Sequence, residues 1–235
     1  MAEPAVRLAD VRFRWSGATP LTLDIPAFEV GAGERVFVHG PSGGGKTTLL
    51  NLLGGVVQPE AGVVSVLGRD LARLSGRARD AFRADRIGFV FQMFNLLPYL
   101  STAENVLLPC RFSAARRARA AAREGGLQGE ARRLLGRMGL DADALAGRPA
   151  SRLSVGQQQR AAAARALIGA PGLIVADEPT SALDADSRDA FLELLFQETE
   201  TAGAAVIFVS HDAGLARRFD REVALRSINR AGAAA

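Results

Sequence analysis

Between residues 40 and 48 the sequence reads Gly40-Pro41-Ser42-Gly43-Gly44-Gly45-Lys46-Thr47-Thr48. A short apolar run, residues 36–38, precedes this stretch, and a second one, residues 49–53, follows it, so we predict a strand, a glycine-rich turn and a helix. Glycines let successive backbone N–H groups face an anion that side chains would keep away. The N-terminus of the helix adds unpaired N–H donors and a partial positive charge. The stretch therefore predicts a loop that holds phosphate groups.

Two side chains of this loop specify which phosphates it holds. Lys46 is the only lysine in the chain, and its ammonium can reach the β- and γ-phosphates of a nucleotide. Thr47 places a hydroxyl where Mg²⁺ binds in such loops. A glycine-rich turn can be purely structural, but the lysine and the strand–helix context favour a nucleoside triphosphate with Mg²⁺.

The pattern of apolar residues predicts an α/β fold. Residues 5–30 alternate apolar and polar positions, which indicates antiparallel strands, whereas residues 173–176 and 205–209 are continuous apolar runs typical of buried parallel strands. Residues 94–152 have a helical pattern. We predict one domain, residues 1–235, with a P-loop NTPase (RecA-like) core, an antiparallel β subdomain and an inserted helical subdomain. The core takes about 1–92 and 160–235, and the helical subdomain about 93–159.

Composition limits the classes of partner. The net charge is +4, and 28 of the 29 basic residues are arginine, which we interpret as a genome-wide bias and not as a nucleic-acid surface. Within the helical stretch, Arg116, Arg117, Arg119 and Arg123 are expected to form a solvated helix face. A single cysteine, Cys110, excludes an intramolecular disulfide. No apolar run approaches the roughly 18–20 residues that span a bilayer, so we expect membrane contact only through a partner.

A pair of acids and a capped helix extend the predicted site. The apolar residues 173–176 end in Asp177 and Glu178; Asp177 is placed to hold Mg²⁺ through a water molecule, and Glu178 to polarise the attacking water as general base. Ser154 begins an alanine-rich helix and is a natural N-cap. This helix start is either an ordinary cap or a surface that meets a γ-phosphate bound to another subunit.

Six motifs in this order resemble the nucleotide-binding subunit of an ATP-binding-cassette (ABC) transporter. They are the phosphate loop, Phe89-Val90-Phe91-Gln92, Leu153-Ser154-Val155-Gly156-Gln157, Ala176-Asp177-Glu178-Pro179-Thr180, Ser181-Ala182-Leu183-Asp184 and Val209-Ser210-His211-Asp212. The match covers nearly the whole chain. The resemblance implies ATP as the nucleotide, ATP hydrolysis as the activity and Mg²⁺ as the metal.

The resemblance also implies roles for individual residues on the side of the bound nucleotide. Gln92 matches the glutamine that contacts Mg²⁺ and the attacking water, and His211 matches the histidine that contacts the γ-phosphate. Trp15 lies where the family places an aromatic residue that stacks on adenine. The alternative for Trp15 is a half-buried strand residue.

Other residues match positions that the family uses between two copies of the chain. Ser154, Gly156 and Gln157 match the signature that closes over the partner's ATP, and Asp184 matches an aspartate that crosses the dimer interface. The implied partners are a second copy of the chain, in a two-fold dimer, and a separate integral membrane permease. The implied location is cytoplasmic, peripheral on the inner face of the cell membrane.

The chain departs from the family pattern at three places. Val155 replaces the first glycine of the usual LSGGQ, His39 stands where a small apolar residue is usual, and residues 226–230 replace a short glycine turn. We expect Val155 to weaken or alter closure without abolishing it.

Two further stretches resemble one group within the family. Residues 88–98 and 102–106 are similar to the ATPases of lipoprotein release, macrolide export and cell division. Regulation of a cell-wall hydrolase through a membrane partner, and import, stay open as alternatives.

Overall fold

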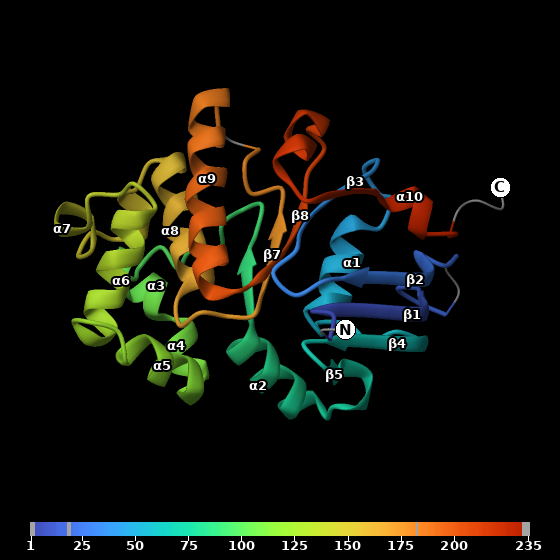
Figure 1. The fold of residues 1–235 in the computed structure, drawn as a ribbon. Helices are drawn as coiled ribbons and strands as arrows, with labels where there is room; N and C mark the ends of the chain where they lie inside the picture. The colour runs from blue at the N-terminus through green and yellow to red at the C-terminus, as the bar shows by residue number, and fades with distance from the viewer. Residues whose placement is uncertain (1–2, 18–19, 182, 232–235) are drawn as a thin grey trace. The chain divides into compact units, whose positions relative to one another are not determined.

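The computed structural model describes residues 3–17, 20–181 and 183–231, which form two compact units (Figure 1). Unit 1 comprises the described residues up to Arg83 and those from Ala205 onward, and unit 2 comprises those from Ala84 to Ala204. The α/β fold predicted above is confirmed, with an antiparallel sheet, parallel strands and a run of helices. The division into a core and a helical subdomain at residues 93–159 stays a prediction.

Unit 1 contains a four-stranded antiparallel sheet in the order β2-β1-β4-β5. Its strands are β1 (Val6–Phe13), β2 (Leu23–Val30), β4 (Ala61–Val66) and β5 (Arg69–Asp70). In β1 the buried residues alternate with more exposed ones, as the sequence pattern predicted, except at Ala9 and Asp10, where the register with β4 shifts. Trp15 lies beyond the end of β1, so its interpretation as a strand residue is wrong.

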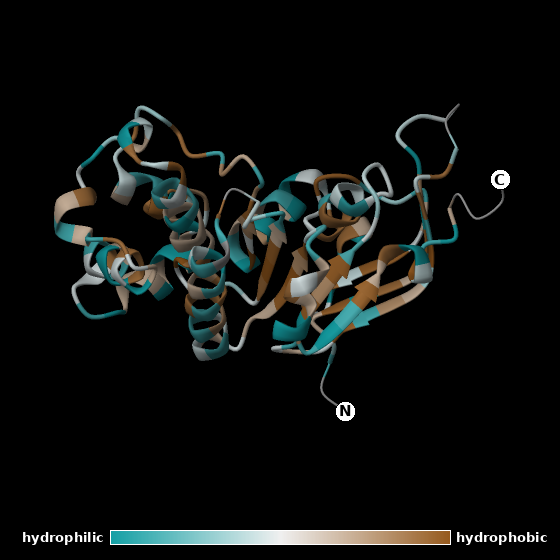
Figure 2. Ribbon diagram, turned by 90° about the horizontal axis from the view of Figure 1, so that it is seen from above, coloured by the Kyte–Doolittle hydropathy of each residue, from teal (hydrophilic) through white to brown (hydrophobic). Residues whose placement is uncertain are grey.

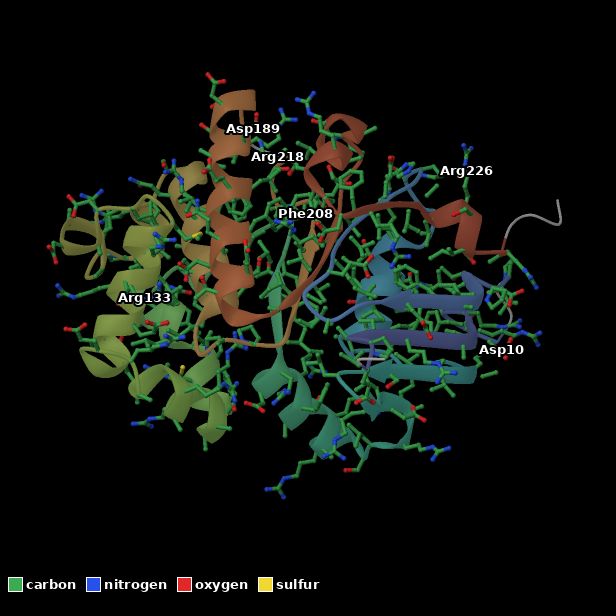
Figure 3. All side chains as sticks on the ribbon, in the orientation of Figure 1. Asp10, Arg133, Asp189, Phe208, Arg218 and Arg226 are labelled. Atoms are coloured by element: carbon green, nitrogen blue, oxygen red, sulfur yellow. The ribbon has the colours of Figure 1, made fainter. Side chains whose placement is uncertain are left out.

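Unit 1 also contains three parallel strands, in which β3 (Arg35–His39) lies between β8 (Ala205–Val209) and β9 (Arg221–Ala224). Every residue of β8 is buried. The ring of Phe208, labelled in Figure 3, stacks on that of Phe37 with a centroid distance of 6.2 Å. These apolar contacts hold the strand that leads into the phosphate loop.

The helices of unit 1 are short. They are α1 (Lys46–Leu53), the 3₁₀ turns at Leu71–Arg73 and Ala213–Arg218, α10 (Leu225–Ile228) and the greater part of α2 (Gly76–Arg86). Arg79 and Arg83 of α2 donate to the backbone carbonyls of Gly54 and Gly55 at the end of α1. Cations at this end of a helix complement its dipole, so α2 stabilises the helix that follows the phosphate loop.

The C-terminal departure from the family pattern has a local function. Asn229 is buried, its side-chain oxygen accepts from the Asp24 N–H at 2.8 Å, and its amide donates to the Thr22 carbonyl at 3.0 Å. Residues 226–230 therefore tie the end of the described chain to the start of β2.

Unit 2 contains two paired parallel strands and a run of helices. The strands are β6 (Ile87–Val90) and β7 (Leu173–Asp177). The helices are α3 (Thr102–Leu107), α4 (Pro109–Phe112), α5 (Ala114–Ala121), α6 (Gly126–Arg137), α7 (Ala142–Leu145), α8 (Val155–Leu167) and α9 (Ala185–Ala202), with a 3₁₀ turn at Ala150–Arg152. Helices account for most of the stretch 94–152 that was predicted to be helical, but they begin only at Thr102, and residues 94–101 are not helical.

Helix α8 lies at the centre of unit 2 and contacts α3, α6, α9 and β6. Its residues Ala161–Leu167 are all buried, and the small alanine side chains let these neighbours approach closely. In Figure 2 several strands are brown and therefore apolar, whereas the helices carry many teal, polar residues.

The prediction that Arg116, Arg117, Arg119 and Arg123 form a solvated helix face is wrong for two of these four residues. Arg116 is 1% exposed and donates to the carbonyls of Ala84, Ile87, Ala166 and Ile168, near the C-terminal ends of α2 and α8. Arg119 is half-buried and donates to the Asp85 and Gly169 carbonyls. Helix ends leave carbonyls without partners, and a guanidinium with five N–H groups can satisfy several of them at once. Arg117 and Arg123 are exposed as predicted.

Candidate functional site

In unit 1, the phosphate loop connects the buried strand β3 to α1, in the order that the sequence predicted. Gly43 and Gly45 have φ angles of 77° and 97°, in the left-handed region that favours glycine. A Cβ at Gly45 would lie 2.8 Å from Cδ2 of Leu23, so the site has no room for a side chain. The loop is thus shaped by backbone geometry and by packing on β2.

Lys46 is held by the loop that it belongs to. Its ammonium donates to the carbonyls of Gly40 at 2.8 Å and Pro41 at 3.0 Å, which places a cation beside the N-terminus of α1. The first turn of α1 contains no acidic residue that would compete with an anion. Thr48 is buried and anchors the helix, while Thr47 is exposed. A cation, a helix N-terminus and a turn of glycines are together suited to polyphosphate.

His211 lies at the same sheet edge as the phosphate loop. Strands β3 and β8 are parallel, Val38 pairs with Val209, and the Ser210 N–H donates to the Val38 carbonyl at 3.2 Å. The loop begins two residues after Val38, and His211 lies two residues after Val209. The carboxyl ends of adjacent parallel strands are where α/β folds bind ligands, so the register brings His211 level with the start of the loop.

Trp15 is 59% exposed and meets Phe13 edge-on, with ring centroids 5.3 Å apart. Phe13 pairs with Leu23 across β1 and β2, and Leu23 is the residue that packs against Gly45. The exposed indole therefore follows the end of β1 that lies beside the phosphate loop. An exposed aromatic face is available there for a nucleobase.

His39, an unusual residue at its position, forms a polar contact with the neighbouring strand. Its Nε2 lies 3.1 Å from Oε1 of Glu222 on the neighbouring strand β9. Glu222 gives the polar ring a partner at this strand end, which explains how unit 1 accepts histidine there.

In unit 2, Gln92, Asp177 and Glu178 follow two adjacent parallel strands. Val90 of β6 pairs with Ala176 of β7, so Gln92 and Glu178 both lie two residues beyond a register pair. Asp177 and Glu178 are half-buried, and Gln92 is exposed. Glu178 has a φ of 45°, a left-handed conformation that is uncommon for a residue with a side chain. Strain of this kind is often found where a side chain is held for function.

The signature residues form a helix cap in this structure. The Ser154 hydroxyl accepts from the Gln157 N–H at 3.3 Å, and the Gln157 side chain accepts from the Ser154 N–H at 3.0 Å, which together make a capping box. Val155 is 52% exposed. A Cβ at Gly156 would meet nothing closer than Leu183 at 3.7 Å, so this chain alone does not require glycine at that position.

Asp184 also acts as a cap, at the start of α9. Its carboxylate accepts from the backbone N–H and the hydroxyl of Ser187, both at 2.9 Å. The bond from the Ser187 N–H, followed by that from its hydroxyl, lowers the pKa of Asp184 below its usual value. Leu183 lies close to Gly156, so the segment with Asp184 adjoins the signature. Ala182 of the same motif is outside the described residues.

The predicted Mg²⁺ donors are of the right chemical kind. A threonine hydroxyl, a glutamine amide and an aspartate carboxylate offer the hard oxygen ligands that Mg²⁺ prefers. Among the described residues there is no cluster of three or more His, Cys, Asp or Glu side chains that could hold a metal by itself. Mg²⁺ usually keeps several waters and binds to one or two carboxylates together with substrate phosphates, so this sparse set fits it.

Sequence reasoning did not single out Arg165, a buried residue of α8. Arg165 donates to the carbonyls of Phe94 and Asn95, just beyond Gln92. The signal was available, because Arg165 interrupts the apolar run Ala161–Leu167. A lone arginine within such a run indicates a buried cation that needs partners.

The chain is similar to known proteins both in sequence and in structure. The family profile described as ABC transporter matches residues 23–181. The lipoprotein-releasing system ATP-binding protein LolD of Novosphingobium aromaticivorans is 40% identical over 227 residues, covering 96% of this chain and 97% of that protein. LolD 1 of Caulobacter vibrioides is 43% identical over 200 residues, covering 83% and 80%. The solved dimer of the ATP-binding cassette MJ0796 with ADP and Pi is 35% identical, with a TM-score of 0.82 and 93% of each chain covered.

Proposed function

The chain belongs to the ABC transporter family, and we propose on this premise that it hydrolyses ATP to drive a membrane permease of the lipoprotein-release type. The observation that carries the proposal is the near full-length similarity to LolD proteins at about 40% identity. The loop at residues 40–48 and the paired strand ends of each unit supply the chemistry that such an activity needs.

Each predicted site residue then has a role in the reaction. The loop N–H groups and Lys46 bind the triphosphate, and Trp15 stacks on the adenine. His211 donates to a γ-phosphate oxygen. Glu178 accepts a proton from the attacking water as general base. Thr47, Asp177 and Gln92 would hold Mg²⁺, which neutralises charge on the phosphates when it is bound.

A second copy of the chain completes the proposed site. The MJ0796 cassette has been solved as a dimer with ADP and Pi, which supports the same arrangement here. The space around Gly156 agrees with this proposal, because the need for a small residue would come from a ligand on the partner and not from this chain. Ser154 and Gln157 shape the helix start, and Asp184 lies beside it. Val155 is expected to weaken closure.

A separate membrane permease is proposed from the similarity to the LolD proteins. Within the described ranges, no helix combines the length and apolar character that a membrane crossing requires. From the similarity to the LolD ATP-binding proteins, we propose a peripheral location on the cytoplasmic face of the membrane, beside an integral permease. A regulatory role in cell division remains the second candidate, because residues 88–98 also resemble the ATPases of that process.

The replacement Glu178→Gln tests the catalytic proposal. It keeps the size and polarity of the side chain but removes the base, so we expect ATP hydrolysis to fall by roughly 10²- to 10⁴-fold. The unhydrolysed ATP should then hold two copies together, which size-exclusion chromatography with ATP and with ADP would detect. ATP hydrolysis at the parent rate would refute the general-base role of Glu178.

A matched control separates loss of the base from loss of the fold. Glu193 lies on the exposed side of α9, and its side chain accepts from Gln197. Glu193→Gln should therefore hydrolyse ATP at the parent rate and remain monomeric after turnover.

Co-purification with a permease that has a large extracytoplasmic domain would support the lipoprotein-release assignment over the importer alternative.

A further inference from the structure

Gln92 occupies the centre of a tight turn whose closing residue is held by another helix. The Phe94 N–H donates to the Phe91 carbonyl at 3.0 Å, so Gln92 and Met93 are the two central residues of a β-turn. The next N–H, that of Asn95, returns to the Met93 carbonyl at 2.6 Å. The direction of the Gln92 side chain therefore depends on how firmly this turn is held.

The turn contains backbone strain. Phe94 and Asn95 have φ angles of 58° and 50°, two consecutive residues in the left-handed region although neither is glycine. Such conformations persist only where the surroundings enforce them, and they concentrate at functional sites. The turn thus needs an external contact to keep its shape.

Arg165 supplies that contact from α8. Its two terminal nitrogens donate to the carbonyls of Asn95 at 2.6 Å and Phe94 at 2.5 Å. Arg165 is 8% exposed, and no carboxylate pairs with it in the part of the chain that the structure describes. A buried guanidinium loses hydration, and burial lowers the pKa of Arg165 to about 10. The carbonyls of the two strained residues, Phe94 and Asn95, are its partners. The arginine therefore needs the turn for its hydrogen bonds, and the turn needs the arginine to keep its shape.

Helix α8 connects this contact to the signature. The helix is capped by Ser154 and runs without interruption from Val155 to Leu167, so Arg165 and the signature belong to one rigid element. The other end of the 92–101 segment is held by Asn105 of α3, whose amide donates to the carbonyls of Leu97, Leu100 and Ser101. Among the described residues, the hydrogen bonds between the Gln92 turn and α8 are those of Arg165.

We propose that Arg165 is a positioning residue for Gln92, through which α8 sets the orientation of the Gln92 turn. This inference rests on the proposed role of Gln92 at Mg²⁺. The guanidinium binds the carbonyl of Phe94, the residue that closes the turn, so a shift of α8 moves Gln92 with it. Arg165 thereby connects two parts of the proposed site. One is the signature at the N-terminus of α8, which is proposed to meet the partner subunit, and the other is Gln92, which is proposed to act on Mg²⁺ and the attacking water.

A double-mutant cycle on the full-length chain tests the inference. Arg165→Gln should lower kcat about tenfold and raise the Mg²⁺ concentration for half-maximal activity several-fold, while KM for ATP changes less than twofold. Gln92→Ala should give a comparable loss. If Arg165 acts through Gln92, adding Arg165→Gln to the Gln92→Ala variant causes no further loss.

Hydrogen exchange provides a readout that does not depend on activity. Without nucleotide or metal, Arg165→Gln should speed exchange of the amides of residues 93–95, since the contact that holds the turn is gone. Arg116→Gln is the matched control, because Arg116 is also a buried arginine bound to backbone carbonyls, and none of those carbonyls lies in the turn. It should lower thermal stability and leave both the exchange of residues 93–95 and the Mg²⁺ midpoint unchanged.

The outcomes separate the inference from the function on which it rests. A Gln92→Ala variant with parent activity would overturn the role of Gln92 itself. If Gln92→Ala is impaired but the Arg165 and Gln92 losses multiply, Arg165 has only a structural role and the inference is wrong. If Arg165→Gln does not fold, Arg165→Lys replaces it in the same cycle, because an ammonium keeps the charge but cannot span both carbonyls in the planar geometry of a guanidinium.

Discussion

Replacing Gly88 with alanine would place a methyl group where α8 passes closest to β6. Gly88 is buried in β6, and a Cβ there would lie 2.3 Å from the backbone oxygen of Ala166 and 2.6 Å from Cδ1 of Ile174. The Ile174 side chain can rotate, but the Ala166 oxygen belongs to the helix backbone. The strand and the helix would therefore have to separate.

The size of the effect follows from these distances. Ordinary van der Waals contact of a Cβ begins at 3.4 Å, so the 2.3 Å approach requires a displacement of about 1.1 Å between β6 and α8. Overpacking a well-filled core in this way costs about 1–3 kcal/mol. For a chain of this size, such a loss lowers Tm by roughly 2–12 °C. Circular dichroism during heating would measure it, and ATP hydrolysis should fall as well, because β6 leads to Gln92.

Gly136→Ala is the matched control for Gly88→Ala. Gly136 lies on the exposed side of α6, and nothing is within 4 Å of the position that its Cβ would take. Alanine favours a helix over glycine by up to about 1 kcal/mol, so this variant should be as stable as the parent or slightly more stable. A Gly88→Ala variant that melts at or above the parent temperature would show that β6 and α8 are not packed as described.

Two further predictions concern stability in the individual units. Burial alone would raise the pKa of Glu198, but hydrogen bonds from Arg133 (Figure 3) and Arg137 outweigh it and hold the pKa below its usual value. A carboxyl group of this kind stabilises the fold at pH values above its ordinary pKa of about 4.3, and this contribution is lost as pH falls through the lower pKa of the folded state. The replacement Glu198→Gln should therefore lower the free energy of unfolding by about 1–3 kcal/mol at pH 7. Urea melts should show this loss of stability at pH 7 and no difference from the parent in acid. The replacement Asn229→Ala should lower the free energy of unfolding by about 1–3 kcal/mol, because it leaves backbone groups of Thr22 and Asp24, at the start of β2, without partners. The control Ser227→Ala removes one exposed hydrogen bond and should cost less than about 1 kcal/mol. Equal losses in the two variants would contradict the anchoring role of Asn229.

Local order in the sequence accounts for what could be predicted. Strands and helices follow from apolar periodicity over a few residues, so the alternation in β1, the buried run of β8 and the helical stretch after β6 were all recognisable. The phosphate loop was equally clear, because its glycines, Lys46 and Thr47 are contiguous and act through one local turn. The family resemblance then linked motifs that are distant along the chain.

Side chains whose partners are distant in sequence could not be placed in this way. Arg116 lies in an alanine-rich helix and looks like a solvated residue, yet it binds four carbonyls, two of them some 30 residues earlier and two some 50 residues later. Arg165 likewise meets a turn 70 residues away. The left-handed backbone conformation of Glu178 also could not be predicted from the type of this residue.

The sequence by itself therefore determined the class of fold and predicted the phosphate loop and the candidate residues, because these depend on short contiguous patterns, and the family resemblance of the ordered motifs added ATP. The tertiary structure decided which polar side chains are buried and what they hold. Helix ends and strained turns expose carbonyls whose positions depend on the packing of several elements, and only the folded chain shows that Arg116 and Arg165 satisfy them.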